Sequence, residues 1–141
     1  MGKKLTQWRE DYRFFSSAAS AACRQMAFAG IAFIWVFKVE NPAGPAIPPA
    51  LHLPGALFAL GLFLDLAQYL CGTAIWGIFH RYHEAKAYES GRADPQVLAR
   101  PWMTWPIGIC FWAKSAVVLL ALTLLSLYAW GIWFAVGSSA G

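Results

Sequence analysis

Three charged residues lie inside apolar stretches of this sequence: Arg24, Asp65 and Lys114. A charge at the centre of a bilayer costs about 2.5–3.5 kcal/mol on translocon insertion scales, so such residues usually pair and face the interior of a helix bundle. One carboxylate shared between two cations satisfies this requirement. Because intramembrane ionisable residues also mark ion pathways and proton relays, these three are the first candidates for chemistry in the chain.

The three charges fall at one depth when each is counted along its apolar run. Arg24 lies about 20 Å and Asp65 about 18 Å from the outer ends of the first and second runs, at 1.5 Å per residue. Lys114 lies eight residues after Pro106, or about 12 Å from the inner end of the third run, which leaves about 18 Å of a core about 30 Å thick. We therefore predict one charged layer, to which each of three helices contributes one residue.

Uncharged polar residues flank this layer. Gln25 neighbours Arg24, and Gln68 and Tyr69 follow Asp65 by three and four residues on the same helical face. They can supply the remaining donors and acceptors. Two interpretations stay open: the layer fixes the register and packing of the helices, or it forms a conduction or proton-relay site. The predicted intramembrane polar layer comprises Arg24, Asp65, Lys114, Gln25, Gln68 and Tyr69.

A second polar group follows the second apolar run, in "FHRYHEAK". His80 and His83 are three residues apart, a spacing that can present two imidazoles to one metal, but no further firm ligand accompanies them. Capping and contact with lipid phosphates, together with Arg81, is the favoured interpretation, and we predict no metal site. With Arg9 and Arg13 near the N-terminus, these residues form a predicted cytoplasmic interface.

Three apolar runs must position these residues. They cover about residues 14–37, 53–79 and 105–136, and each is long enough for a crossing, which needs about 20 residues. The proline-rich segment "NPAGPAIPPALHLP" predicts a short, stiff turn between the first two, and a polar loop over residues 80–101 follows the second. The predicted fold class is all-α: an integral membrane bundle of three transmembrane helices, forming a single transmembrane domain over residues 1–141.

The composition agrees with a membrane location. Of the 141 residues, 59% are hydrophobic and 13% charged, against about 45–50% and about 25% in soluble domains. The net charge of +4 is better explained by attraction to anionic lipid, so we expect the lipid bilayer as a partner and no nucleic acid. The three cysteines are an odd number inside apolar runs and predict packing residues. We expect a multi-pass protein of the bacterial inner membrane.

The distribution of Lys and Arg predicts the orientation. Four of them precede the first run and four lie in residues 80–101, whereas the proline-rich segment has only Lys38 at its edge. Because short cytoplasmic segments carry the excess of positive charge, the N-terminus is predicted to be cytoplasmic and the C-terminus to be outside. A cleaved signal peptide is the competing interpretation of the first run, which Arg24 inside its apolar core disfavours.

The first helix is predicted to extend beyond the membrane as an N-terminal amphipathic segment. Trp8, Tyr12 and Phe15 recur at helical spacing there, so one face can lie in the headgroup layer. Small residues recur every four residues further on, as in Ser16 and Ser20, and such faces let helix backbones approach closely. We therefore expect a homo-oligomer.

Two functions stay open. The first is a small self-associating membrane protein, channel-like or membrane-perturbing, built around the charged layer. The alternative is a membrane anchor or accessory subunit that docks a cytoplasmic protein partner through the N-terminal segment and the 80–101 loop. No catalytic motif is present, so we do not expect an enzyme. In size and number of crossings the chain is similar to the three-helix anchors of respiratory succinate dehydrogenases, but its histidines lie at edges or in a loop, so neither haem nor another cofactor is expected.

Overall fold

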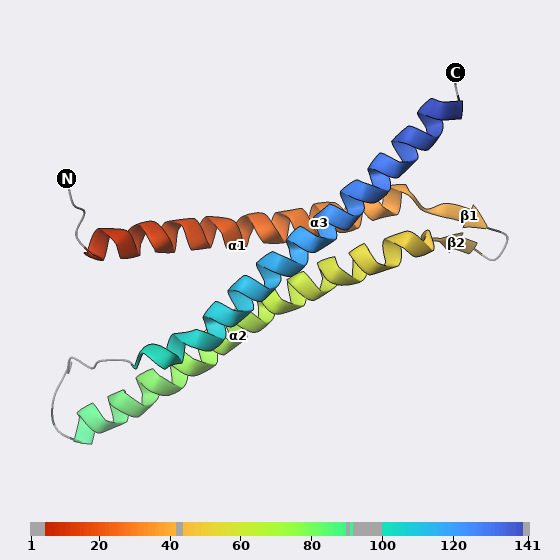
Figure 1. The fold of residues 1–141 in the computed structure, drawn as a ribbon. Coiled ribbons are helices and arrows are strands. Elements are labelled where there is room, and N and C mark those ends of the chain that lie inside the picture. Colours follow the sequence, from red (N-terminus) through yellow and green to blue (C-terminus); the bar gives the residue numbers. More distant parts are fainter. Residues whose placement is uncertain (1–4, 42–43, 90, 92–99, 140–141) are drawn as a thin grey trace.

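The computed structural model describes residues 5–41, 44–89, 91 and 100–139. Three long helices dominate it: α1 (Leu5–Val36), α2 (His52–Glu89) and α3 (Trp105–Ser139) (Figure 1). At 1.5 Å per residue they are about 48 to 57 Å long, more than a hydrocarbon core of about 30 Å. All three are long and apolar enough to cross a membrane, which confirms the predicted all-α protein with three candidate transmembrane helices.

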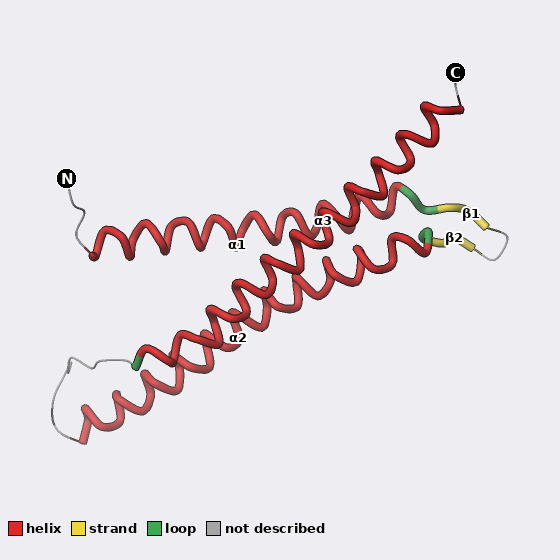
Figure 2. Tube along the Cα trace, in the orientation of Figure 1, coloured by secondary structure: helices red, strands yellow, loops and turns green. Residues whose placement is uncertain are grey.

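Short elements occupy the connections (Figure 2), and the sequence did not predict them. The strands β1 (Val39–Asn41) and β2 (Gly44–Ala46) pair in antiparallel fashion after α1. The 3₁₀ turns η1 (Pro49–Leu51) and η2 (Pro101–Thr104) lead into α2 and α3. Both turns begin at a proline, whose fixed φ suits a first helical turn and whose missing N–H leaves nothing unpaired there.

Helix α2 continues ten residues beyond the predicted crossing. We expected a loop over residues 80–101, but residues 80–89 are helical. The segment "HRYHEAKAYE" contains no proline or glycine and is rich in Ala, Glu, Lys and Arg, which favour helix. The helix ends just before Gly91, whose φ of 65° is typical of a C-terminal glycine. Residues 90 and 92–99 lie outside the described part of the chain.

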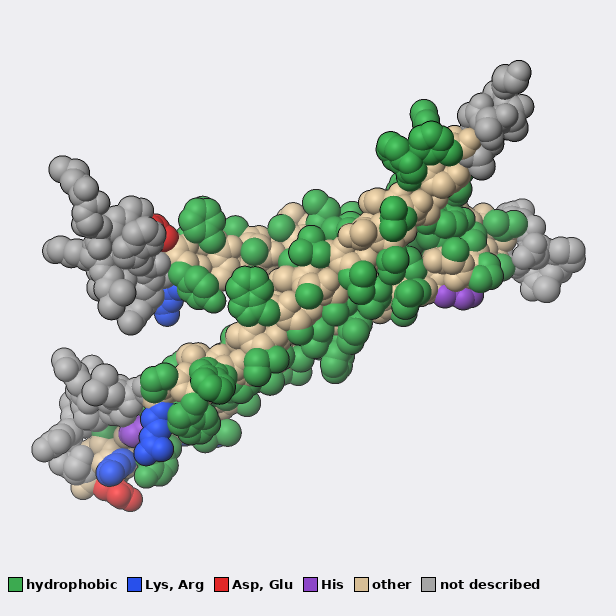
Figure 3. All heavy atoms as spheres, viewed as in Figure 1, with side chains coloured by type: hydrophobic (Ala, Val, Ile, Leu, Met, Phe, Trp, Pro, Cys, Tyr) green, Lys and Arg blue, Asp and Glu red, His purple; other side chains and the backbone are tan. Residues whose placement is uncertain are grey.

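Helices α2 and α3 lie side by side, whereas α1 joins them near the end that carries β1 and β2 (Figure 1). We call the part of the bundle between the charged layer and these strands the hairpin half, and the other part the open half. In α1, no described side chain before Ser20 is buried. Figure 3 shows hydrophobic side chains over the middle of the molecule and charged side chains at the ends of α1 and α2 away from the strands.

The apolar core lies in the hairpin half. The Phe58 ring, which is fully buried, packs against the backbone of Gly30 so closely that a Cβ atom there would overlap the ring. A Cβ atom on Gly61 would lie 2.6 Å from Cγ2 of Val118. Glycines thus bring all three helices together, as small residues do in membrane bundles. The buried cluster consists of Ala27, Ile34, Leu51, Phe58, Val118, Ala121 and Leu125.

We predict that Gly30→Ala destabilises the bundle by about 1–3 kcal/mol, because the added methyl group overfills a packed core. Thermal unfolding in detergent, followed by Trp fluorescence, measures the effect. Gly131→Ala is the matched control, since a Cβ atom at Gly131 meets nothing within 4 Å. Equal melting temperatures for the two variants would contradict the packing described for α1 and α2.

Candidate functional site

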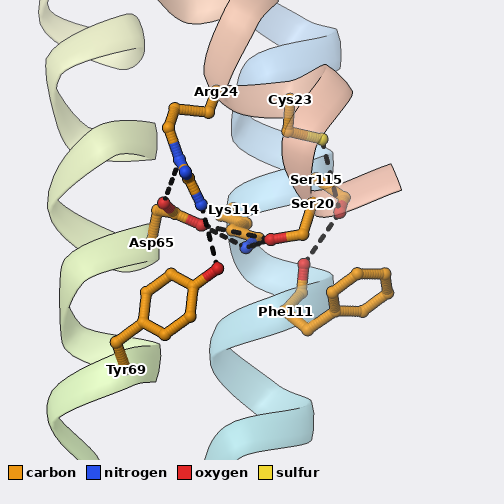
Figure 4. A network of polar contacts seen from close by, with 8 residues as sticks. All are labelled: Ser20, Cys23, Arg24, Asp65, Tyr69, Phe111, Lys114 and Ser115. Atoms are coloured by element: carbon orange, nitrogen blue, oxygen red, sulfur yellow. Dashed lines mark hydrogen bonds and ion pairs between the residues drawn. The ribbon is translucent and has the colours of Figure 1, made fainter. Parts of the chain in front are cut away.

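Asp65 lies at the centre of a polar network that joins the three helices (Figure 4). Its Oδ2 atom accepts a hydrogen bond from Nε of Arg24 at 2.8 Å. Its Oδ1 atom accepts one from Nζ of Lys114 at 2.5 Å. The structure therefore brings together the three charges that the sequence placed at one depth, and each comes from a different helix.

Ser20 is a fourth member of the network. Its hydroxyl donates to Oδ1 of Asp65 at 3.3 Å and accepts from Nζ of Lys114 at 2.5 Å. Ser20 lies one helical turn before Arg24, so both residues of α1 reach the same carboxylate. The sequence placed Ser20 in a small-residue packing face and on the same helical stripe as Arg24, and this shared stripe was the signal that it could join the layer, in which it was not included.

The two cations differ in their surroundings. The side chain of Lys114 is 1% exposed, whereas that of Arg24 is 41% exposed. Nη2 of Arg24 donates to the hydroxyl of Tyr69 at 2.9 Å, and Tyr69 is itself exposed. Lys114 is thus enclosed by the three helices, and Arg24 lies at the rim of the network.

A second set of contacts ties α1 to α3 beside the charged layer. The thiol of Cys23 lies 3.8 Å from Oγ of Ser115, which donates at 2.8 Å to the carbonyl oxygen of Phe111. The ring centroid of Phe111 is 5.7 Å from Nζ of Lys114, within the range of a cation–π interaction. Lys114 therefore contacts a carboxylate, a hydroxyl and an aromatic face.

The two glutamines of the predicted polar layer lie outside this network. Gln25 is exposed and has no hydrogen-bond partner among the described residues, because successive helical residues point about 100° apart and Arg24 takes the inward direction. Gln68 has a buried Oε1 atom that also lacks a partner among the described residues. Sequence spacing set the depth of both residues but not their direction around the helix axis.

A cavity of about 1080 Å³ lies in the open half, between the amino-terminal part of α1 and the other two helices. Its lining comes from residues 12–20, 68–76 and 104–113. Every one of these segments lies on the same side of the charged layer. Ser20, Gln68 and Tyr69 line its inner end, so the cavity leads to the charged layer.

The predicted cytoplasmic interface is remote from the charged layer. Nδ1 of His80 lies 3.7 Å from Oε2 of Glu84 on the following turn, and both side chains are exposed. The ring of His83 lies 4.4 Å from that of Phe79 and 5.1 Å from that of Tyr82. His80 therefore has a carboxylate partner, and His83 has aromatic partners on its own helix.

The arginines of this predicted interface lie at the same end of the molecule as His80 and His83. Arg13 and Arg81 are exposed, and the side chain of Arg9 lies outside the described residues. Among the side chains that the structure describes, no group of three His, Cys, Asp or Glu residues is placed to hold a metal ion.

Comparison with protein families, with curated proteins and with solved structures finds no match to this chain.

The geometry itself defines what the site can do. Two cations and one carboxylate sum to a charge of +1 when all three are ionised, so the layer attracts anions. The carboxylate is shared among Arg24, Lys114 and Ser20, which also makes the layer a three-helix junction.

We predict that Lys114→Met destabilises the protein by about 3–5 kcal/mol, because it leaves the buried Asp65 with Arg24, at the rim, as its one cationic partner among the described residues. Arg24→Met should cost less, since Arg24 is partly exposed and Asp65 keeps the enclosed Lys114. Denaturation in mixed micelles measures both variants. A larger loss for Arg24→Met than for Lys114→Met would contradict this order of importance.

Proposed function

We propose that the chain is a self-associating membrane component rather than an enzyme, and that copies meet along α1 through Gln25. The observation that carries the proposal is the exposure of Gln25, without a partner among the described residues, beside the charged layer and inside a candidate membrane span. A polar side chain in lipid lacks the water that would satisfy it, so contact with another protein surface is favoured.

The surroundings of Gln25 support contact with a second copy. Ala18, Ala22 and Ala29 are exposed and share a helical stripe with Gln25, at spacings of four, three and four residues. Small residues with a polar side chain among them are typical of close helix–helix contacts in membranes. A primary amide both donates and accepts, so Gln25 can pair with its own copy across a two-fold axis.

The proposed ion-conducting or membrane-perturbing activity belongs to the assembly. Within one chain, the contacts of Phe58 with Gly30 and of Val118 with Gly61 close the hairpin half with apolar groups. A path through the membrane therefore requires the space between copies, where Gln25 and the half-exposed Arg24 supply polar groups. The charge of the layer favours anions on such a path.

We expect the purified protein to form dimers or larger oligomers in lipid nanodiscs and to raise chloride flux in liposomes. Gln25→Leu should weaken association by about 3- to 20-fold, since an intramembrane side-chain hydrogen bond contributes about 0.6–1.7 kcal/mol. Flux should fall in parallel. Thr123→Val is the control, because Thr123 is exposed on α3 but bonds to its own helix. The proposal is wrong if the protein is monomeric at every concentration, or if Gln25→Leu leaves the chloride flux unchanged.

A second candidate function follows from the length of α2. Residues 80–89 extend the helix beyond the predicted crossing, and Arg81, Tyr82 and Tyr88 are exposed on it. An exposed surface that combines tyrosine and arginine is typical of protein interfaces. It supports the alternative of a membrane anchor that docks a cytoplasmic protein.

Under this alternative, a specific cytoplasmic protein co-purifies with the chain from its native cells. Arg81→Glu combined with Tyr88→Ser should abolish that co-purification and leave the oligomer intact. Under the leading proposal the same variant changes neither association nor chloride flux. Quantitative mass spectrometry of the purified complexes, with Gln25→Leu as the comparison, separates the two functions.

A further inference from the structure

The cavity in the open half is polar at its inner end. The hydroxyls of Ser16 and Ser17 donate to carbonyl oxygens of their own helix, which leaves their lone pairs available as acceptors. Water in the cavity can donate to these oxygens, whereas an acyl chain would cover them without offering a hydrogen bond.

Positive charges lie at both ends of the cavity. Arg13 lines the cavity 11 residues before Arg24, which is about 16 Å from the charged layer and at the level of the headgroups. Arg13 is exposed and has no ion-pair partner among the described residues. Ser20, at the inner end, contacts Lys114. Arg13, Arg24, Lys114 and Asp65 together sum to +2, so the space between them concentrates anions.

The cavity does not continue through the molecule. The buried cluster of the hairpin half begins directly beyond the layer, where Phe58 contacts Gly30 and Val118 contacts Gly61. Aromatic rings of Trp76 and Trp105 line the opposite end, 11 residues after Asp65 and nine before Lys114. Because tryptophan collects at membrane–water interfaces, this end of the cavity opens at a membrane surface.

We propose that this cavity is a water-filled vestibule that opens only to the cytoplasmic side and admits small inorganic anions as far as Ser20. The side follows from the Lys and Arg distribution, and the ligand class follows from the positive charges of Arg13 and of the layer. Lys114 supplies charge without itself being exposed. The vestibule is a property of a single chain and does not depend on contact between copies.

Thiol accessibility tests the proposal in the full-length protein in membrane vesicles. The background variant carries serine in place of Cys23, Cys71 and Cys110. It is used on condition that its melting temperature equals that of the unsubstituted protein. Ser17→Cys then places a thiol in the cavity, and Leu70→Cys places one on an exposed part of α2 that does not line it. The probes are membrane-impermeant anionic and cationic methanethiosulfonates, with rates normalised to those of free cysteine.

We expect Ser17→Cys to react at least tenfold faster than Leu70→Cys in inside-out vesicles and not above the Leu70→Cys rate in right-side-out vesicles. The anionic reagent should be preferred, and Arg13→Gln should reduce that preference several-fold.

Equal rates at the two positions would show that lipid or protein fills the cavity. The proposal would also be overturned if Ser17→Cys reacted faster than Leu70→Cys in right-side-out vesicles, or if Arg13→Gln left the preference for the anionic reagent unchanged. Adding Gln25→Leu should change none of these rates, so failure of the vestibule and failure of self-association are distinguishable.

Discussion

The bundle depends on one carboxylate that is shared by cations from two other helices. Without Asp65, Arg24 and Lys114 would place two positive charges in an apolar region with nothing to oppose them. With it, each helix has only one depth at which its charge is satisfied, so sliding α1 or α3 by one turn, about 5.4 Å, breaks an ion pair. A lipid environment gives the helices no hydrophobic drive to associate, which makes such a specific polar contact more decisive than it is in water.

The two halves of the bundle differ because their residues differ in size. In the hairpin half, Gly30 and Gly61 let Phe58 and Val118 approach backbone directly, and the three helices close around an apolar core. In the open half the facing positions carry aromatic rings and serines, and the described part of α1 before Ser20 buries no side chain. The charged layer marks the boundary between these two kinds of packing.

Much of this arrangement could be predicted from the sequence, because helix geometry converts residue number into depth. The three candidate membrane spans and the common depth of Arg24, Asp65 and Lys114 follow from hydropathy and a fixed rise per residue. Rotation about the helix axis could not be predicted, so Gln25 was placed in the network and Ser20 was omitted from it. The helical residues 80–89 were also missed, because hydropathy shows where an apolar run ends and not where its helix ends. The helix-favouring composition of this segment up to Gly91 was the signal that could have found them.

A junction and the proposed anion site are compatible in one layer because the two cations differ in exposure. Lys114 is enclosed by Asp65, Ser20 and the Phe111 ring, so it stabilises the junction and acts on its surroundings only through its field. Arg24 keeps one hydrogen bond to Asp65 and one to Tyr69 while part of its side chain stays accessible. An anion near the layer therefore meets a positive potential that the structure maintains at no cost to the ion pairs.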